Sequence, residues 1–230
     1  MTDKGTETSH QTLRWGHFAE DRAQARFLET IVPMLIHHFA PSVFDITQTL
    51  DFTRFQASSW KEVNKYAGEA CIEAARRGLN LCVIMRDLEE VNCPQGRWNE
   101  AFETTIRKLH ESIPSETYGI ACIGLPVKTI EYWFWYVQHF FRNEAVEPQR
   151  LEDYPQNGKP EDALLSVKSR VYDYKRTVKS AKLEQECVKN LCAQITIAHL
   201  ERLAAHSPSF QSFFKEVQQR VYLMNTSILA

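Results

Sequence analysis

The chain has 230 residues, of which 27 are basic and 29 acidic, so the formal net charge is −2 and the sequence pI is about 6.5. No run approaches the roughly 18 apolar residues that a membrane-spanning helix needs, and the first ten residues lack the apolar centre of a signal peptide. Six cysteines are too few for a disulfide scaffold at this length, so we expect reduced thiols and a cytoplasmic protein without membrane contact.

Strand and helix patterns alternate along the first two thirds of the chain. Residues 79–86 and 118–127 are apolar on both faces, which is typical of strands buried in a parallel sheet. Pro33 is expected to kink its helix or to split off the last turn, and Gly78 to end the next helix, which Ser58 or Ser59 caps. The predicted elements are strand 12–19, helix 20–40, strand 43–50, helix 59–78, strand 79–86, helix 97–112, strand 118–127 and helix 129–141.

This alternation predicts an α/β fold with a parallel four-stranded, Rossmann-like sheet flanked by helices and a C-terminal helical extension. An antiparallel α+β sheet is the alternative, but it needs short hairpins, and residues 12–142 contain no Asn-Gly or Asp-Gly hairpin signal. We divide the chain into a disordered tail (1–11), an α/β domain (12–142), a linker or surface excursion with three prolines (143–160) and a helical region packed on the α/β domain (161–230).

The C-terminal region has helical spacing throughout. Residues 183–205 predict one continuous helix with an apolar stripe. Ser207 followed by Pro208 is a cap with proline at the first helical position, and it predicts the start of a last helix.

Acidic residues follow three of the predicted strands. Glu20 comes after the first strand, Asp87, Glu89 and Glu90 come after the third, and Glu131 follows the fourth. Carboxyl ends of parallel strands meet at one edge of a sheet, where carboxylates without a cation between them repel. Oxygen ligands of this kind suit Mg²⁺ or Mn²⁺. The alternative is that residues 87–90 simply open a solvated loop.

These motifs carry a family resemblance. A glutamate after the first strand and an Asp-x-Asp-type motif after a later apolar strand resemble the TOPRIM fold of topoisomerases, primases and OLD-type nucleases. The segments FAEDRAQARFLETIV, LCVIMRDLEEV, GIACIGLPVKTIEYWFWY and SPSFQSFFKEV are similar to those of TOPRIM-related proteins encoded near ATPases in bacterial defence loci. The similarity covers most of residues 12–217, although Glu89 replaces the second aspartate and Asp21 a frequent glycine.

The resemblance implies a Mg²⁺- or Mn²⁺-dependent nuclease that cuts DNA or RNA in anti-phage defence with an ATPase partner. It assigns catalysis to Glu20, Asp87 and Glu89, and metal binding to these three and Glu90. Glu131 is a possible additional acid, although a first-turn carboxylate also stabilises a helix dipole. The rival hypothesis is a non-catalytic interaction subunit of an ATPase-containing complex, and a homo-oligomer is compatible with either.

A basic stretch lies in the C-terminal region, with a local charge of +5 in a chain of −2. Tyr172 and Tyr174 are interleaved with its cations, a pattern that could grip a phosphate backbone. A solvated helix face and a docking surface for a partner protein remain open as alternatives. The candidate nucleic-acid-binding residues are Lys168, Arg170, Lys175, Arg176, Lys179 and Lys182.

Other features are less informative about function. Thr129 can cap the helix over residues 129–141. This helix is apolar on every face, which favours a core helix over a base-stacking platform. The sequence has neither a Gly-x-x-x-x-Gly-Lys phosphate loop nor a Gly-x-Ser-x-Gly nucleophile elbow. Cys187, Cys192 and His199 are too widely spaced for an ordinary zinc site.

Overall fold

The structure is a computed structural model, and it describes residues 11–41, 44–51, 60–88, 98–142, 167–172 and 181–228. Part of the predicted tail, the linker over 143–160 and the Ser58 or Ser59 cap lie outside these ranges. So do Glu89, Glu90, Lys175, Arg176 and Lys179.

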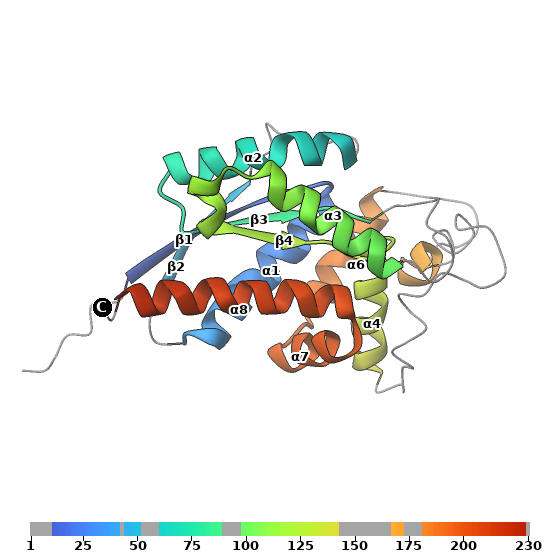
Figure 1. The fold of residues 1–230 in the computed structure, drawn as a ribbon. Coiled ribbons are helices and arrows are strands. Elements are labelled where there is room, and N and C mark those ends of the chain that lie inside the picture. The colour runs from blue at the N-terminus through green and yellow to red at the C-terminus, as the bar shows by residue number, and fades with distance from the viewer. Residues whose placement is uncertain are drawn as a thin grey trace, which may run out of the picture.

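The centre of the fold is a parallel sheet (Figure 1). Strand β1 (Gln11–Ala19) pairs with β3 (Leu81–Met85), and β3 pairs with β4 (Ala121–Gly124), all in parallel. Strand β2 (Phe44–Asp51) lies on the other side of β1, which gives the order β2-β1-β3-β4. The predicted α/β class with a parallel sheet flanked by helices is confirmed.

Alternation along the strands creates two hydrophobic cores. Leu81, Val83 and Met85 face one core, while Cys82 and Ile84 face the other. Helices α2 (Trp60–Arg76) and α3 (Trp98–Ser112) cover the smaller core. The larger core is shared by α1 (Arg22–Phe39), α4 (Glu131–Phe141), α6 (Ala181–Cys192), α7 (Ile197–His206) and α8 (Pro208–Ile228). The C-terminal helices therefore complete the core of the α/β fold.

Three predicted elements differ from the structure. Helix α1 continues past Pro33 to Phe39, so its last turn is not split off. Residues 118–120 belong to the 3-10 helix η2 (Ser115–Ile120) and not to β4. The single helix predicted over 183–205 is two helices, because Thr196 caps α7: its side chain accepts a hydrogen bond from the His199 N–H at 3.4 Å and competes with helix continuation.

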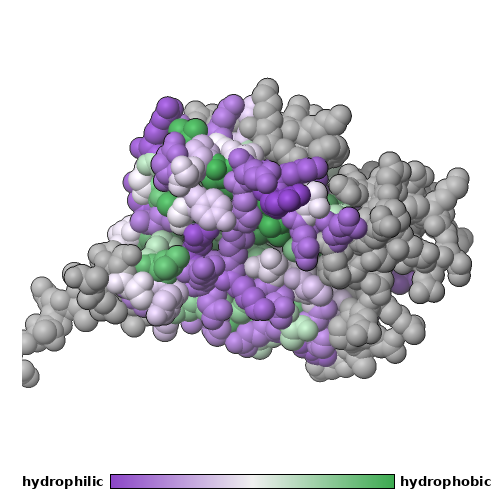
Figure 2. All heavy atoms as spheres, viewed as in Figure 1, coloured by the Kyte–Doolittle hydropathy of each residue, from purple (hydrophilic) through white to green (hydrophobic). Residues whose placement is uncertain are grey.

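Helix α8 lies along β4 and is held there by polar contacts as well as by apolar packing. Its start is the predicted one, since the Phe210 N–H donates to Ser207 Oγ at 3.2 Å. The Ile123 N–H donates to Glu216 Oε2 at 3.0 Å, and Arg220 Nε donates to the Ala121 carbonyl at 2.9 Å. Figure 2 shows that the face of the molecule carrying α8 is mainly hydrophilic. None of the helices in the described part of the chain is long and apolar enough to cross a membrane.

Gly68 in α2 marks a close approach between helices. A Cβ atom added there would lie 2.4 Å from the Ser112 carbonyl oxygen of α3, which is backbone and cannot move alone. We expect Gly68→Ala to destabilise the fold by about 2 kcal/mol, because the overlap outweighs the gain of about 1 kcal/mol in helix propensity. Gly119→Ala is the control, since nothing lies within 4 Å of its added Cβ. Urea unfolding of both variants checks the difference, and equal midpoints would contradict it.

Candidate functional site

The predicted acids lie at the carboxyl ends of the strands. From β1 the chain passes to β2 on one side and then crosses to β3 on the other, so the strand order reverses between β1 and β3. Open α/β sheets bind ligands beyond such a reversal. Glu20 and Asp21 follow β1, Asp87 follows β3, and Glu131 opens α4 after β4.

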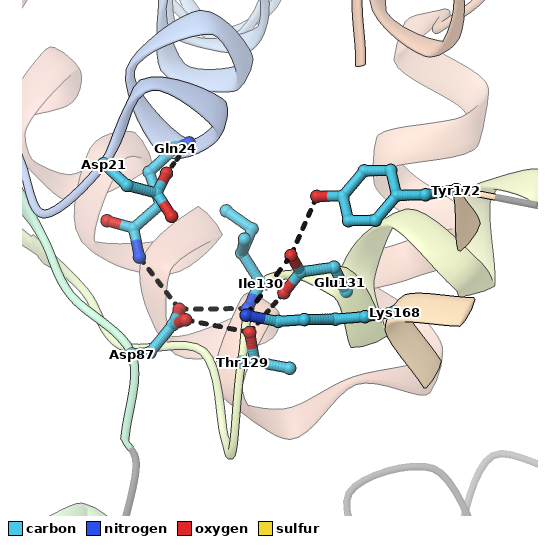
Figure 3. A network of polar contacts seen from close by, with 8 residues as sticks. All are labelled: Asp21, Gln24, Asp87, Thr129, Ile130, Glu131, Lys168 and Tyr172. Carbon is cyan, nitrogen blue, oxygen red and sulfur yellow. Dashed lines mark hydrogen bonds and ion pairs between the residues drawn. The ribbon is translucent and has the colours of Figure 1, made fainter. Parts of the chain in front are cut away.

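Asp87 is the centre of a buried hydrogen-bond network (Figure 3). Its side chain is 5% exposed, so the alternative of a solvated loop is wrong for this residue. Its Oδ1 accepts from Gln24 Nε2 and from the Ile130 N–H, each at 2.9 Å, and its Oδ2 accepts from Thr129 Oγ1 at 2.9 Å. Asp87 thus ties the end of β3 to the first turns of α1 and α4.

The turn before α4 brings Thr129 and Glu131 to Asp87. Lys128 has a φ of 69°, which is unusual for a residue with a side chain and reverses the chain here. Backbone bonds from the Leu88 N–H to the Pro126 carbonyl and from the Lys128 N–H to the Leu88 carbonyl hold this turn against the end of β3. Thr129 does not cap α4 as predicted: the residue at the cap is Ile130, without a side-chain cap, and the Thr129 hydroxyl lies between two carboxyl groups instead.

Glu131 is the second buried acid, and its side chain is likewise nearly inaccessible to solvent. Its Oε1 accepts from the Tyr172 hydroxyl at 2.8 Å and lies 3.7 Å from Lys168 Nζ, while its Oε2 contacts Thr129 Oγ1. Oxygens of Asp87 and Glu131 contact the same hydroxyl oxygen, so they lie within about 5 Å of each other. Figure 3 shows Tyr172 on the side of Glu131 opposite to Asp87, while the Lys168 side chain extends past the Glu131 carboxylate from that same side.

The Thr129 hydroxyl lies between the two carboxyl groups. It has a single hydrogen and cannot donate to Asp87 and Glu131 at once. The pKa of Asp87 is raised well above its ordinary value, first by burial and then by repulsion from Glu131, Asp21 and Glu20. Negative charge at this edge is therefore only partly compensated by the described residues.

Glu20 and Asp21 complete the acidic edge. Glu20 Oε2 accepts from the Asp87 N–H at 3.0 Å, so the Glu20 carboxylate lies against the backbone of Asp87. Asp21 is the N-cap of α1 and accepts from the Gln24 N–H at 2.8 Å. Although Asp21 remains exposed, desolvation followed by repulsion from Glu131 raises its pKa. The catalytic assignment of Glu89 and the metal assignment of Glu90 stay predictions, because both residues lie outside the described ranges.

A pocket of about 700 Å³ opens beside these acids. It lies between the first turns of α1, the start of α4, the helical turn at 167–171 and helix α6. Asp21 and Glu131 line it, together with Lys168 and Tyr172, so the pocket leads from the surface to the acidic edge. Its other lining residues are Arg22, Ala23, Ala25, Arg26, Glu29, Ala181, Glu184, Gln185, Val188 and Lys189.

The described residues of the predicted basic stretch lie in different surroundings. Lys168 is half-buried and points to Glu131, which places one predicted phosphate-binding cation inside the acidic site. Arg170 is exposed, with its guanidinium 5.7 Å from the centre of the Trp135 ring, and Lys182 is exposed on α6. In α4 the predicted core role is confirmed, since Tyr132, Trp133, Phe134 and Tyr136 are buried.

Three polar residues of the site were not identified from the sequence. Gln24 had a local signal, because Asp21-x-x-Gln24 has the spacing of a capping box. The Gln24 Oε1 accepts from the Glu20 N–H at 3.0 Å, and its Nε2 then reaches Asp87. Thr129 was interpreted only as a cap. Tyr172 had no local signal, since it reaches Glu131 across 41 residues.

The donor chemistry fits a hard divalent cation, because Glu20, Asp87 and Glu131 offer oxygen ligands. As they are placed, however, no three His, Cys, Asp or Glu side chains within the described ranges form a group that could hold a metal ion. Comparisons with protein-family models, with characterised proteins and with solved structures give no match to this chain, so the site is interpreted from its own geometry.

Proposed function

We propose that the chain is a Mg²⁺- or Mn²⁺-dependent nuclease whose reaction takes place at the acidic edge of the sheet. The observation that carries the proposal is that Glu20, Asp87 and Glu131 come from three separate segments and meet beyond the ends of β1, β3 and β4. Burial and then repulsion from neighbouring acids raise the pKa of Asp87, and a divalent cation would relieve the repulsion. The TOPRIM resemblance of the sequence supports the same assignment.

In this proposal the position of each residue determines its role. Glu20, Asp87 and Glu131 would hold the cation, which supplies a polarised phosphate and an activated water. Gln24 and Thr129 hold the Asp87 carboxyl in place through its two oxygens. Lys168 lies on the pocket side of Glu131, where an ammonium group can contact a substrate phosphate. Glu89 and Glu90 would add ligands from the following segment.

A second function rests on a different observation. Both oxygens of Asp87 and both oxygens of Glu131 already accept or contact partners from within the chain. Such a satisfied network is also expected of a fold-stabilising cluster, in a protein that acts as an interaction subunit of an ATPase-containing complex. The anti-phage role, the ATPase partner and the choice of DNA or RNA belong to the proposal in either form.

Cleavage assays decide between the two functions. The protein is incubated with labelled single-stranded and duplex DNA and RNA, with Mg²⁺, with Mn²⁺ or with EDTA. We expect metal-dependent cleavage that falls at least about 100-fold in Asp87→Asn and in Glu131→Gln, because each removes a ligand charge while keeping the side-chain shape.

Glu111→Gln is the matched control. Glu111 is an exposed acid of α3 whose ion pair within the described ranges is with Arg107 at 3.9 Å, so its loss should leave cleavage unchanged. Cleavage that survives in Asp87→Asn would remove the nuclease assignment from this site. If the wild-type protein cuts nothing, and calorimetry detects no Mg²⁺ or Mn²⁺ binding, the interaction-subunit function is favoured.

A further inference from the structure

The pocket beside the acidic edge has cations on two opposing walls. Arg22 and Arg26 are one helical turn apart on α1, and Lys189 lies across from them on α6. All three side chains are exposed. Helices α1 and α6 pack directly against each other, so this spacing is fixed by the core beneath.

These cations are available to a ligand, whereas several acids of the pocket are already engaged. Within the described ranges no ion pair joins Arg22, Arg26 or Lys189 to an acid. By contrast Glu131 is bound by Tyr172 and Lys168, and Glu29 lies 3.5 Å from His17 Nε2. The pocket lining carries four acids and four cations, but the groups of Arg22, Arg26 and Lys189 have no ion pair within the described ranges and can bind an anion. Arginine favours phosphate because its planar group can donate two parallel hydrogen bonds.

The volume of the pocket limits the size of the ligand that it can bind. A volume of about 700 Å³ is in the usual range for sites that enclose a small organic ligand, and it would suit one or two nucleotides. A base-paired duplex is a rigid rod whose stacked pairs cannot enter such a space without unpairing. A single strand has no such barrier, since its bases and phosphates can turn separately.

We propose that this pocket binds a single-stranded segment or end of a nucleic acid, with its phosphates between the arginines of α1 and Lys189 of α6. This inference rests on the proposed nuclease function and names its substrate form. The strand would then run from the cationic walls toward Lys168 and Glu131, which line the same pocket. Binding of this kind needs no metal ion, so it can be measured apart from catalysis.

The test is fluorescence anisotropy in EDTA with three labelled probes: dT10, rU10 and a blunt 20-base-pair DNA duplex. We expect dT10 or rU10 to bind at least about 10-fold more tightly than the duplex, and the dT10 and rU10 arms tell DNA from RNA. The triple variant Arg22→Gln, Arg26→Gln, Lys189→Gln should weaken single-strand binding at least 10-fold and lower the salt slope by about 2.

The matched control is Arg107→Gln, Lys108→Gln, Lys215→Gln, which removes the same charge from exposed positions on α3 and α8, outside the pocket. It should change the affinity less than about 2-fold, and thermal unfolding checks that both triple variants are folded. Duplex binding equal to single-strand binding, no binding of either strand, or equal losses in the two triple variants would overturn the inference. Strand binding that depends on the pocket, without cleavage in Mg²⁺ or Mn²⁺, would instead refute the nuclease function and leave this inference standing.

Discussion

Asp87→Ala is expected to destabilise the fold by about 3 kcal/mol at pH 7 in the absence of divalent metal. The substitution leaves Gln24 Nε2 and the Ile130 N–H without their acceptor in a buried place, and each such loss costs roughly 1–3 kcal/mol. Relief of repulsion from Glu131 and Glu20 offsets only part of this cost. A strand-end carboxylate that faced solvent would contribute little to packing, and its removal would leave stability unchanged, but Asp87 is buried.

Asp87→Asn separates the effect of the Asp87 charge from the effect of its hydrogen bonds. Its Oδ1 can still accept from Gln24 and Ile130, and its Nδ2 can donate to the Thr129 hydroxyl, which then donates to Glu131. We expect its stability to equal or exceed that of the wild type. Urea unfolding of both variants in EDTA measures the difference, and equal loss in the two would mean that the charge of Asp87, and not its hydrogen bonds, holds the turn.

The raised pKa of Asp87 determines whether its contribution to folding stability rises or falls with pH. The folded protein keeps a proton on Asp87 at a pH where the unfolded chain has released it. The contribution of Asp87 to stability is therefore greatest at low pH and falls as the pH rises toward the folded-state pKa. Asp87→Asn should remove this decline.

Glu216→Gln is expected to stabilise the fold by about 2–3 kcal/mol at pH 8 and to change it little at pH 4. Burial, partly opposed by the Ile123 N–H and Arg220, raises the pKa of Glu216 from 4.5 to about 7. Ionised Glu216 thus costs stability, and the cost grows by roughly 1.4 kcal/mol per pH unit as the pH rises from about 4.5 to 7. Glutamine keeps an oxygen for the Ile123 N–H without the charge.

Urea unfolding of wild type and Glu216→Gln between pH 4 and 8 checks this expectation. His110 lies 3.7 Å from Glu216, so the curves are compared with those of His110→Gln. Burial and Arg220 lower the pKa of His110, which favours its neutral form at neutral pH. A Glu216→Gln curve parallel to that of the wild type would contradict the raised pKa, because it would show that Glu216 has the same pKa in the folded and the unfolded protein.

The sheet and the position of the acids along the chain could be predicted from local patterns. Both strand periodicity and the residue that follows a strand depend only on a short stretch of sequence. Glu20 and Asp87 follow two paired strands, and the Glu20 carboxylate accepts from the Asp87 N–H. The partners of Glu131 were not predictable in this way: Lys168 and Tyr172 arrive from beyond a long intervening segment, and their contact depends on how the C-terminal helices pack.

Competing local interactions explain the remaining differences between the predicted and the observed helices and strands. The apolar stripe over 183–205 continues through Ile195, yet Thr196 and His199 form a reciprocal cap that starts a new helix. In η2 the apolar pattern was mistaken for a strand, because periodicity alone does not separate a short buried strand from a helical turn.

The contacts of Glu216 and Arg220 with β4 affect whether molecules of this protein can associate through the edge of the sheet. The Ile123 N–H and the Ala121 carbonyl point away from β3, and they are the groups to which a further strand from another chain would bind. Because α8 supplies an acid and a guanidinium in place of that strand, the sheet has no open hydrogen-bonding positions at these two residues. The last helix is thus a barrier to strand exchange and aggregation, and a chain ending before Pro208 would present the outer side of β4 to its neighbours.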